Sequence, residues 1–209
     1  MYSTQVATQL LAKNAVKVSL DNPFTWTSGI KSPIYCDNRV LISHTDARKI
    51  ILDEFESRIK QLDIKFDFLA GTATAGIPWA AFLAERMQVP MVYVRSAPKA
   101  HGASKQVEGD TEFLAGKKAL VIEDLISTGG SSINTVEALE RELKVESSYV
   151  LAIFQYGFGN AKKSFSQKNI SFDSLTDFAT LLSVANLSQA ESDKVLTFAS
   201  DPQNWFNNL

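Results

Sequence analysis

The chain has 209 residues, a mass of 23.0 kDa and a hydrophobic content of 45%, which suffices for one globular unit with a sizeable core. Its net charge of -2 and isoelectric point of about 5.7 give no bulk attraction to nucleic acid or to an anionic membrane, so an anionic ligand must be held locally. A single cysteine, Cys36, excludes an internal disulfide framework, and nowhere do about 18 apolar residues run together. We expect a cytoplasmic protein without a membrane span.

Two amphipathic helices are predicted in the first sixty residues. Residues 3–18 place apolar side chains at roughly helical spacing, and residues 46–60 do so more regularly. The apolar positions are Val6, Leu10, Leu11 and Val18 in the first stretch, and Ile50, Ile51, Phe55 and Ile59 in the second.

Beyond residue 65 the pattern alternates between strands and helices. Short apolar runs rich in aromatic or β-branched residues predict buried strands, and the longer stretches between them predict helices. The strands are predicted at residues 66–70, 91–94, 118–123 and 149–154, and the helices at residues 77–88 and 131–144. This alternation predicts the α/β class, with a largely parallel central sheet flanked by helices.

Two stretches depart from the alternation. Residues 95–117 contain five basic residues and three glycines with almost no apolar periodicity, which predicts a long connection. Near the end of the chain, two closing helices are predicted at residues 174–187 and 188–199, each opened by a serine suited to cap it.

The segment "ALVIEDLISTGGSS", residues 119–132, is the most informative stretch of the sequence. An apolar strand runs into two acids, Glu123 and Asp124, and then into hydroxyl residues and two glycines that open a helix. In doubly wound sheets such a turn presents backbone N–H groups to an anion. It lacks the lysine of a nucleoside triphosphate loop and the spacing of a dinucleotide loop, so the turn predicts a site for a phosphate monoester.

The two acids indicate the chemical group to which that phosphate is attached. Carboxylates accept hydrogen bonds from the 2- and 3-hydroxyls of a ribose, and their charge stabilises a positive charge that develops at C1. The alternative is that Glu123 and Asp124 begin a solvated loop and that the glycines only turn it. The complete run from strand to helix favours a ribose 5-phosphate site.

Four motifs in order resemble the type I phosphoribosyltransferases, and the orotate phosphoribosyltransferase family in particular. "VIEDLISTGGS" resembles their signature for phosphoribosyl pyrophosphate (PRPP), and "GTATAGIP" at residues 71–78 resembles their pyrophosphate loop. "FTWTSGIKSPIYCDNR" at residues 24–39 resembles their amino-terminal stretch, and "VRSAPKAHGASKQVEG" at residues 94–109 resembles their flexible catalytic loop. The resemblance implies one domain over residues 1–209, with residues 1–45 contributing a small hood and residues 160–209 forming carboxyl-terminal helices.

The resemblance also implies roles for individual residues. Lys99, Glu123 and Asp124 are the expected catalytic residues, and Lys99 would reach the neighbouring subunit's site in a homodimer whose mobile loops close over the substrate. The expected PRPP-binding residues are Arg95, Lys99, His101, Glu123, Asp124, Leu125, Ile126, Ser127, Thr128, Gly129, Gly130 and Ser131. A solvated basic loop is the commoner meaning of scattered lysine and arginine, and only the other motifs favour a binding role here.

For the base, the resemblance places Tyr35 and Cys36 near the ring, with Ser127 within reach. Many members of the family carry lysines where Thr27, Ala75 and Ser96 stand, and an arginine near Gln155. The three lysines belong to pyrophosphate binding, and Lys31 and Lys105 are hypothetical replacements for them, because they lie close to these motifs in the sequence. The tryptophans Trp26, Trp79 and Trp205 are assigned to packing, and Cys36 is assigned no nucleophilic role.

The expected reaction is transfer of ribose 5-phosphate from PRPP to orotate, giving orotidine 5-monophosphate and pyrophosphate in pyrimidine nucleotide (UMP) synthesis. No His/Cys cluster has metal-ligand spacing, so no protein-bound transition metal is expected. We expect instead that Mg²⁺ takes part, carried by the pyrophosphate and ribose of the substrate. A purine phosphoribosyltransferase and a PRPP-sensing regulator are the alternatives. No nucleic-acid or membrane partner is expected.

Overall fold

A six-stranded sheet forms the centre of the molecule, which is a computed structural model describing residues 2–26, 29–98, 105–145 and 148–208. Its strands are β5 (Phe68–Thr72), β6 (Met91–Val94), β7 (Val107–Glu108), β8 (Ala119–Ile126), β9 (Ser148–Gln155) and β10 (Ser171–Asp177). The strand order is β10-β9-β8-β5-β6-β7, and all neighbours are parallel except β7, which is antiparallel to β6. The predicted α/β class is confirmed.

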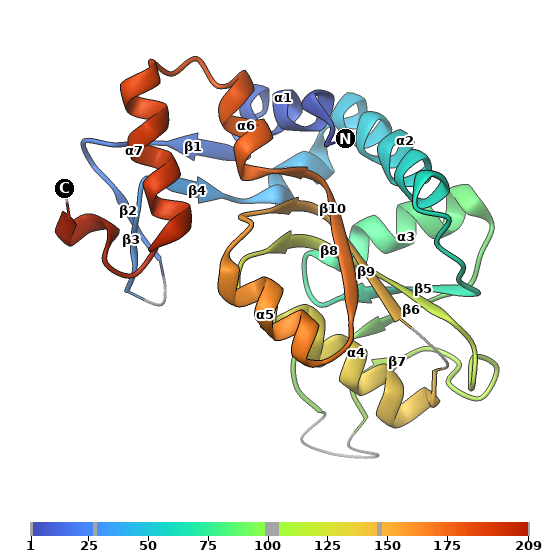
Figure 1. Cartoon of the computed structure of the whole chain (residues 1–209). Helices are drawn as coiled ribbons and strands as arrows, with labels where there is room; N and C mark the ends of the chain where they lie inside the picture. Colours follow the sequence, from blue (N-terminus) through green and yellow to red (C-terminus); the bar gives the residue numbers. More distant parts are fainter. Residues whose placement is uncertain (1, 27–28, 99–104, 146–147, 209) are drawn as a thin grey trace.

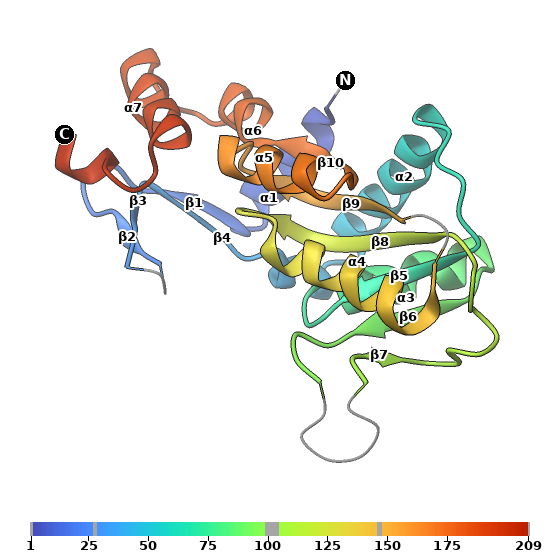
Figure 2. The same cartoon turned by 60° about the horizontal axis from the view of Figure 1, so that its bottom comes forward.

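Helices cover both faces of this sheet (Figures 1 and 2). Helices α1, α2 and α3 lie on one face, and α4 and α5 lie on the other. The helices are α1 (Thr4–Ala12), α2 (Thr45–Gln61), α3 (Gly76–Met87), α4 (Gly130–Leu143), α5 (Gly159–Gln167), α6 (Phe178–Val184) and α7 (Gln189–Ser200). Since α3 leads from β5 to one side and α4 leads from β8 to the other, the winding reverses between β5 and β8, where α/β sheets bind ligands.

Two small antiparallel sheets lie beside α7, apart from the main sheet (Figure 1). One pairs β1 (Val16–Val18) with β4 (Ile34–Cys36), and the other pairs β2 (Phe24–Thr25) with β3 (Lys31–Ser32). Short 3-10 helices follow β4 and α7, as η1 (Asn38–Ser43) and η2 (Trp205–Asn208). The described residues between 16 and 36 thus form a part separate from the main sheet, whereas α1 packs on α2, α6 and β10. The hood expected from residues 1–45 stays a prediction.

Most predicted elements are confirmed, but the first predicted helix was too long. The structure has helices α2, α3 and α4 and strands β6 and β9 within one residue of the predicted bounds. The helix predicted over residues 3–18 ends at Ala12, because Asn14 takes a left-handed conformation with φ of 55° and residues 16–18 pair with β4.

The carboxyl-terminal fifty residues also differ from the prediction. Residues 171–177 form the edge strand β10 instead of opening a helix, and Asp177, not Ser174, caps the shorter helix α6. Ser188 caps α7 as predicted, in a capping box with Glu191. Within the described ranges, no helix is both long and apolar enough to cross a bilayer.

Candidate active site

The two acids lie near the carboxyl end of β8, which borders the point where the winding reverses. The strand was predicted to end at Glu123 but continues to Ile126, and β9 pairs with it up to Gln155. The acids therefore belong to a hydrogen-bonded central strand, which holds their backbone rigidly. Glu123 and Asp124 are successive residues of this strand, and their carboxyl groups interact with each other.

Glu123 is fixed by helix α4. Its side chain is only 4% exposed, and Oε2 accepts a hydrogen bond of 3.1 Å from the Ser132 hydroxyl in the first turn of α4. Its Oε1 accepts a hydrogen bond of 3.0 Å from the backbone N–H of Asp124. Oε2 of Glu123 thus ties the strand to the helix that follows it, while Oε1 is held by the next residue of the strand itself.

Asp124 is held from the other side by a buried asparagine. Asn38, which is 0% exposed, donates from Nδ2 to the backbone oxygen of Asp124 at 2.6 Å and accepts a hydrogen bond of 3.3 Å from the Cys36 thiol. A single side chain therefore connects the acid strand to β4 and to the residues expected to meet the base.

The electrostatics of this pair are unfavourable in the absence of a ligand. Burial, followed by the charge of Asp124, raises the pKa of Glu123 well above its usual value. Burial also raises the pKa of Asp124. Two partly desolvated carboxylates side by side suit a partner that offers hydroxyl donors or positive charge, which a ribose with a developing oxocarbenium centre provides.

The predicted phosphate loop leads from β8 into α4. Gly129 caps the helix with φ of 84°, and an added Cβ at this position would lie 2.5 Å from the ring of Phe165 in α5. The first N–H groups of a helix have no partner within it, and here they follow the hydroxyl residues Ser127 and Thr128 directly. Residues 127–131 therefore offer the backbone N–H groups and hydroxyls that the predicted phosphate site needs, and phosphate binding there stays a prediction.

The predicted pyrophosphate loop, residues 71–78, follows β5 on the other side of the reversal. It enters α3 so close to β8 that a Cβ at Gly76 would lie 2.4 Å from the backbone oxygen of Ile122. A cavity of about 230 Å³ lies between this loop and the start of α4, lined by Thr72, Ala73, Val94, Ser96, Gly130, Ser131, Asn134 and Thr135. The two predicted anion loops thus face one another across the carboxyl edge of the sheet.

A larger cavity of about 700 Å³ lies under the small sheets. It brings together Tyr35, Cys36 and Ser127, the three residues predicted for the base. Tyr35 is 40% exposed, whereas burial raises the pKa of the Cys36 thiol well above its usual value, which fits the inert role assigned to it.

The sequence did not reveal the rest of this cavity's wall. Trp26, assigned to packing, lines the cavity and also packs on Tyr156, with ring centroids 5.3 Å apart. Phe158 and Asn160 follow β9, and residues 199–203 close the cavity from the end of α7. Trp79 and Trp205 are buried, as expected of packing residues. No local pattern marks these contributions, because they come from segments distant in sequence.

The arginine that the family carries near Gln155 has no replacement among the described residues that line the large cavity. Gln155 is turned into the core, where Nε2 donates to Ser174 at 2.8 Å and to the Tyr2 hydroxyl at 3.1 Å. Among the described residues that line the cavity, there is no lysine or arginine. Lys31 lies beside its wall, where Nζ donates to Thr25 Oγ1 at 2.7 Å. The hypothesis that Lys31 replaces a lysine of the pyrophosphate site remains a prediction.

The basic connection is described only at its two ends. Arg95 is exposed and lies 3.6 Å from Glu108, while Lys105 donates to Thr111 Oγ1 at 3.4 Å. Lys99 and His101, and also Thr27, lie outside the described residues. No group of three His, Cys, Asp or Glu side chains arranged for a metal occurs in the part of the chain that the structure describes.

Comparison with known proteins identifies the family. Residues 41–170 match the phosphoribosyl transferase domain, and this range includes both predicted anion loops. The orotate phosphoribosyltransferase of Coxiella burnetii is 43% identical over 207 residues, covering 97% of this chain and 98% of that protein. The chain belongs to the orotate phosphoribosyltransferases.

Two further comparisons agree with this family. The orotate phosphoribosyltransferase of Oceanobacillus iheyensis is 46% identical over 93% of this chain and 96% of that protein. The crystal structure of orotate phosphoribosyltransferase from Aeropyrum pernix superposes with a TM-score of 0.72 at 29% identity, covering 85% of this chain and 96% of the other. The type I phosphoribosyltransferase fold expected from the sequence is therefore confirmed.

Proposed function

We propose that the protein transfers ribose 5-phosphate from PRPP to N1 of orotate, releasing pyrophosphate and forming orotidine 5-monophosphate for pyrimidine synthesis. The observation that carries the proposal is that Glu123 and Asp124 lie in β8 just before the predicted phosphate loop, residues 127–131, and that Ser127 and Thr128 of this loop line the cavity that holds Tyr35 and Cys36. This arrangement fits a sugar that carries its phosphate on one side and exchanges a pyrophosphate for a base on the other.

In this proposal each loop has one task. The N–H groups of residues 127–131 bind the 5-phosphate, and Asp124 with Glu123 accepts hydrogen bonds from the ribose hydroxyls. As the bond from C1 to the pyrophosphate oxygen breaks, the two carboxylates stabilise the positive charge at C1, and N1 of orotate forms the new bond there. Arg95, Lys99 and His101 neutralise the departing pyrophosphate, beside the buried hydroxyl of Thr72.

The residues present suit Mg²⁺. This cation prefers oxygen ligands, and Asp124 offers a carboxylate. Burial raises the pKa of this carboxyl group, so a nearby cation would stabilise its charged form. Bound with PRPP, the ion would screen the pyrophosphate charges. We propose that it is carried by substrate oxygens with few direct protein ligands.

The assay that tests the proposal compares orotate, uracil, hypoxanthine and adenine as acceptors, with PRPP and Mg²⁺ present. We expect turnover with orotate alone, and a fall of about two orders of magnitude or more when a chelator removes Mg²⁺. Turnover with a purine but not with orotate would contradict the base assignment and favour a purine enzyme. PRPP binding without turnover of any base would favour a PRPP-sensing regulator.

We further propose a cytoplasmic homodimer whose sites are shared. The single cysteine supports a reducing compartment. The resemblance assigns Lys99 to the neighbouring subunit's site, and mixed dimers of Lys99→Ala and Asp124→Asn chains test this assignment.

A further inference from the structure

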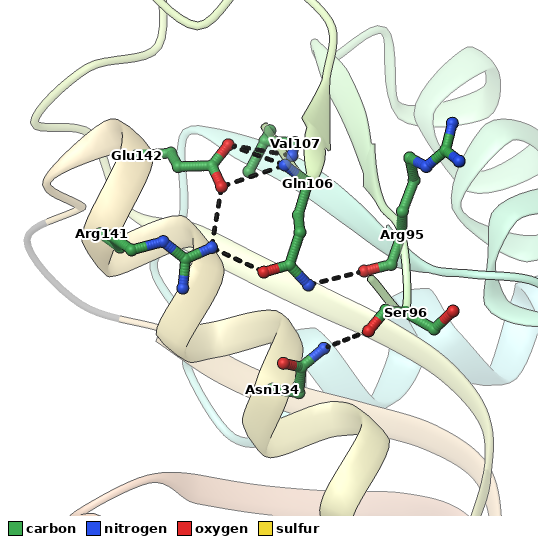
Figure 3. A network of polar contacts seen from close by, with 7 residues as sticks. All are labelled: Arg95, Ser96, Gln106, Val107, Asn134, Arg141 and Glu142. Carbon is green, nitrogen blue, oxygen red and sulfur yellow. Dashed lines mark hydrogen bonds and ion pairs between the residues drawn. The ribbon is translucent and has the colours of Figure 1, made fainter. Parts of the chain in front are cut away.

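The two ends of the basic connection meet on helix α4 (Figure 3). The backbone N–H of Arg95 donates to the backbone oxygen of Gln106 at 3.0 Å, and Nε2 of Gln106 donates to the backbone oxygen of Arg95 at 3.0 Å. Asn134 of α4 lies 3.4 Å from the backbone oxygen of Ser96, to which its Nδ2 donates. Residues before and after the connection are thus fixed to each other and to the helix.

Gln106 is the centre of this arrangement. Its side chain is only 4% exposed, and both its backbone groups and both polar atoms of its side chain are paired. Oε1 accepts a hydrogen bond of 2.6 Å from Arg141, and the backbone N–H donates to both carboxylate oxygens of Glu142 at 3.0 and 3.2 Å. A buried glutamine with every polar group satisfied has one orientation available to it.

Glu142 holds two successive backbone N–H groups of the returning chain. Besides Gln106, the N–H of Val107 donates to Oε2 at 3.1 Å, and Arg141 donates to Oε1 at 2.8 Å. Burial acts to raise the pKa of Glu142, but the hydrogen bonds from Gln106, Arg141 and Val107 outweigh it and the pKa lies below the usual value. The carboxylate is therefore ionised at neutral pH and accepts all these hydrogens.

We propose that Gln106, Arg141 and Glu142 form a clamp that positions Arg95 and Ser96 relative to the phosphate loop. The proposal rests on the proposed function. Helix α4 begins at the proposed phosphate loop and carries Arg141 and Glu142 of the clamp in its last turn, so one rigid element fixes the distance between the proposed 5-phosphate site and the predicted pyrophosphate ligand Arg95. Ser96 lines the smaller cavity directly. The clamp residues are positioning residues and are not expected to touch substrate.

The test measures substrate KM values and backbone hydrogen exchange in Glu142→Gln and Gln106→Ala. A glutamine at 142 offers one acceptor oxygen and turns its amide toward N–H groups that need an acceptor. We expect KM for PRPP to rise about tenfold in both variants while KM for orotate changes less than about twofold, because only the pyrophosphate ligands are displaced. Exchange of the amides of Arg95 and Val107 should become faster.

Glu140→Gln is the matched control, because Glu140 is exposed on the same helix and the change removes the same charge. It should leave both KM values and the amide exchange unchanged. Arg141→Ala should raise the KM for PRPP as Glu142→Gln and Gln106→Ala do. Arg141→Lys keeps a charged donor for Gln106 and should therefore recover part of the PRPP affinity. Equal rises in both KM values, or wild-type KM for PRPP in folded Gln106→Ala, would overturn the clamp.

The clamp and the proposed function can fail separately. Wild-type protein that does not use orotate would contradict the proposed function. The clamp could then still be tested, by amide exchange at Arg95 and Val107 and by calorimetry of PRPP binding to the wild type and the variants. Active wild-type protein whose Glu142→Gln variant keeps slow exchange and the wild-type KM for PRPP would contradict the clamp alone.

Discussion

Replacing Asp124 with asparagine is expected to lower kcat for orotate by about 10²–10³-fold, because the variant loses a preorganised negative charge beside C1 of the ribose in a partly desolvated site. The backbone around Asp124 should be unchanged, since its oxygen keeps the hydrogen bond from Asn38 and its N–H keeps the bond to Glu123. The measurement is steady-state kinetics with saturating PRPP and orotate.

A stability measurement separates this loss from unfolding. The native pKa values of Glu123 and Asp124 are raised, so the native state binds protons more tightly than the unfolded chain. Stability from this pair therefore falls as pH rises from the unfolded values, about 4, through the raised native ones. At pH 7 the Asp124→Asn variant should unfold at the wild-type temperature or above it, because one of two repelling charges is gone.

The matched control for this variant is Asp21→Asn, which removes an exposed carboxylate that does not line either cavity. It should keep wild-type kcat. An Asp124→Asn protein with wild-type kcat would contradict the role of the acid pair, and a variant that melts well below wild type would contradict the electrostatic account of the site.

Replacing Lys99 with alanine is the second change that is expected to lower kcat strongly. By the family resemblance Lys99 meets the pyrophosphate as it leaves, and loss of one such charged donor is expected to lower kcat by about 10²–10³-fold with the fold intact. Lys99→Gln, which keeps most of the side chain's length without its charge, should show nearly the same loss. Normal turnover in either variant would refute the assignment.

Mixed dimers test whether Lys99 acts across the subunit interface. A dimer that combines a Lys99→Ala chain with an Asp124→Asn chain contains one site with both changes and one with neither, if each Lys99 serves its partner's site. Random mixing of the two inactive variants should then restore about a quarter of wild-type activity. Failure of mixing to restore activity, with subunit exchange shown independently, would place Lys99 in its own subunit's site.

The parts of the fold and site that the sequence predicted are those encoded in contiguous residues. Strand β6 is a run of apolar residues with the predicted bounds, and the acids and glycines of residues 123–130 lie together because one strand and one helix start carry them. An apolar strand or a turn into a helix requires particular residue types in a fixed order, and this order can be recognised within a short segment of sequence.

The parts that were missed depend on partners far away in the sequence. Strand β10 reads as polar, and its Ser174 is buried because Gln155 of β9 donates a hydrogen bond to its hydroxyl. Trp26 reaches the larger cavity because it packs on Tyr156, which follows β9, and no periodicity in residues 24–32 reveals this contact. Burial of a polar side chain becomes predictable only when its partner is known.

The most direct measurement is a crystal structure of the protein with PRPP and Mg²⁺ bound. The account predicts that the 5-phosphate accepts hydrogen bonds from backbone N–H groups of residues 127–131 and that the ribose 2- and 3-hydroxyls lie within hydrogen-bond distance of the carboxylates at positions 123 and 124. Sugar diphosphate bound with its ribose away from both carboxylates, or with its 5-phosphate outside that loop, would contradict it.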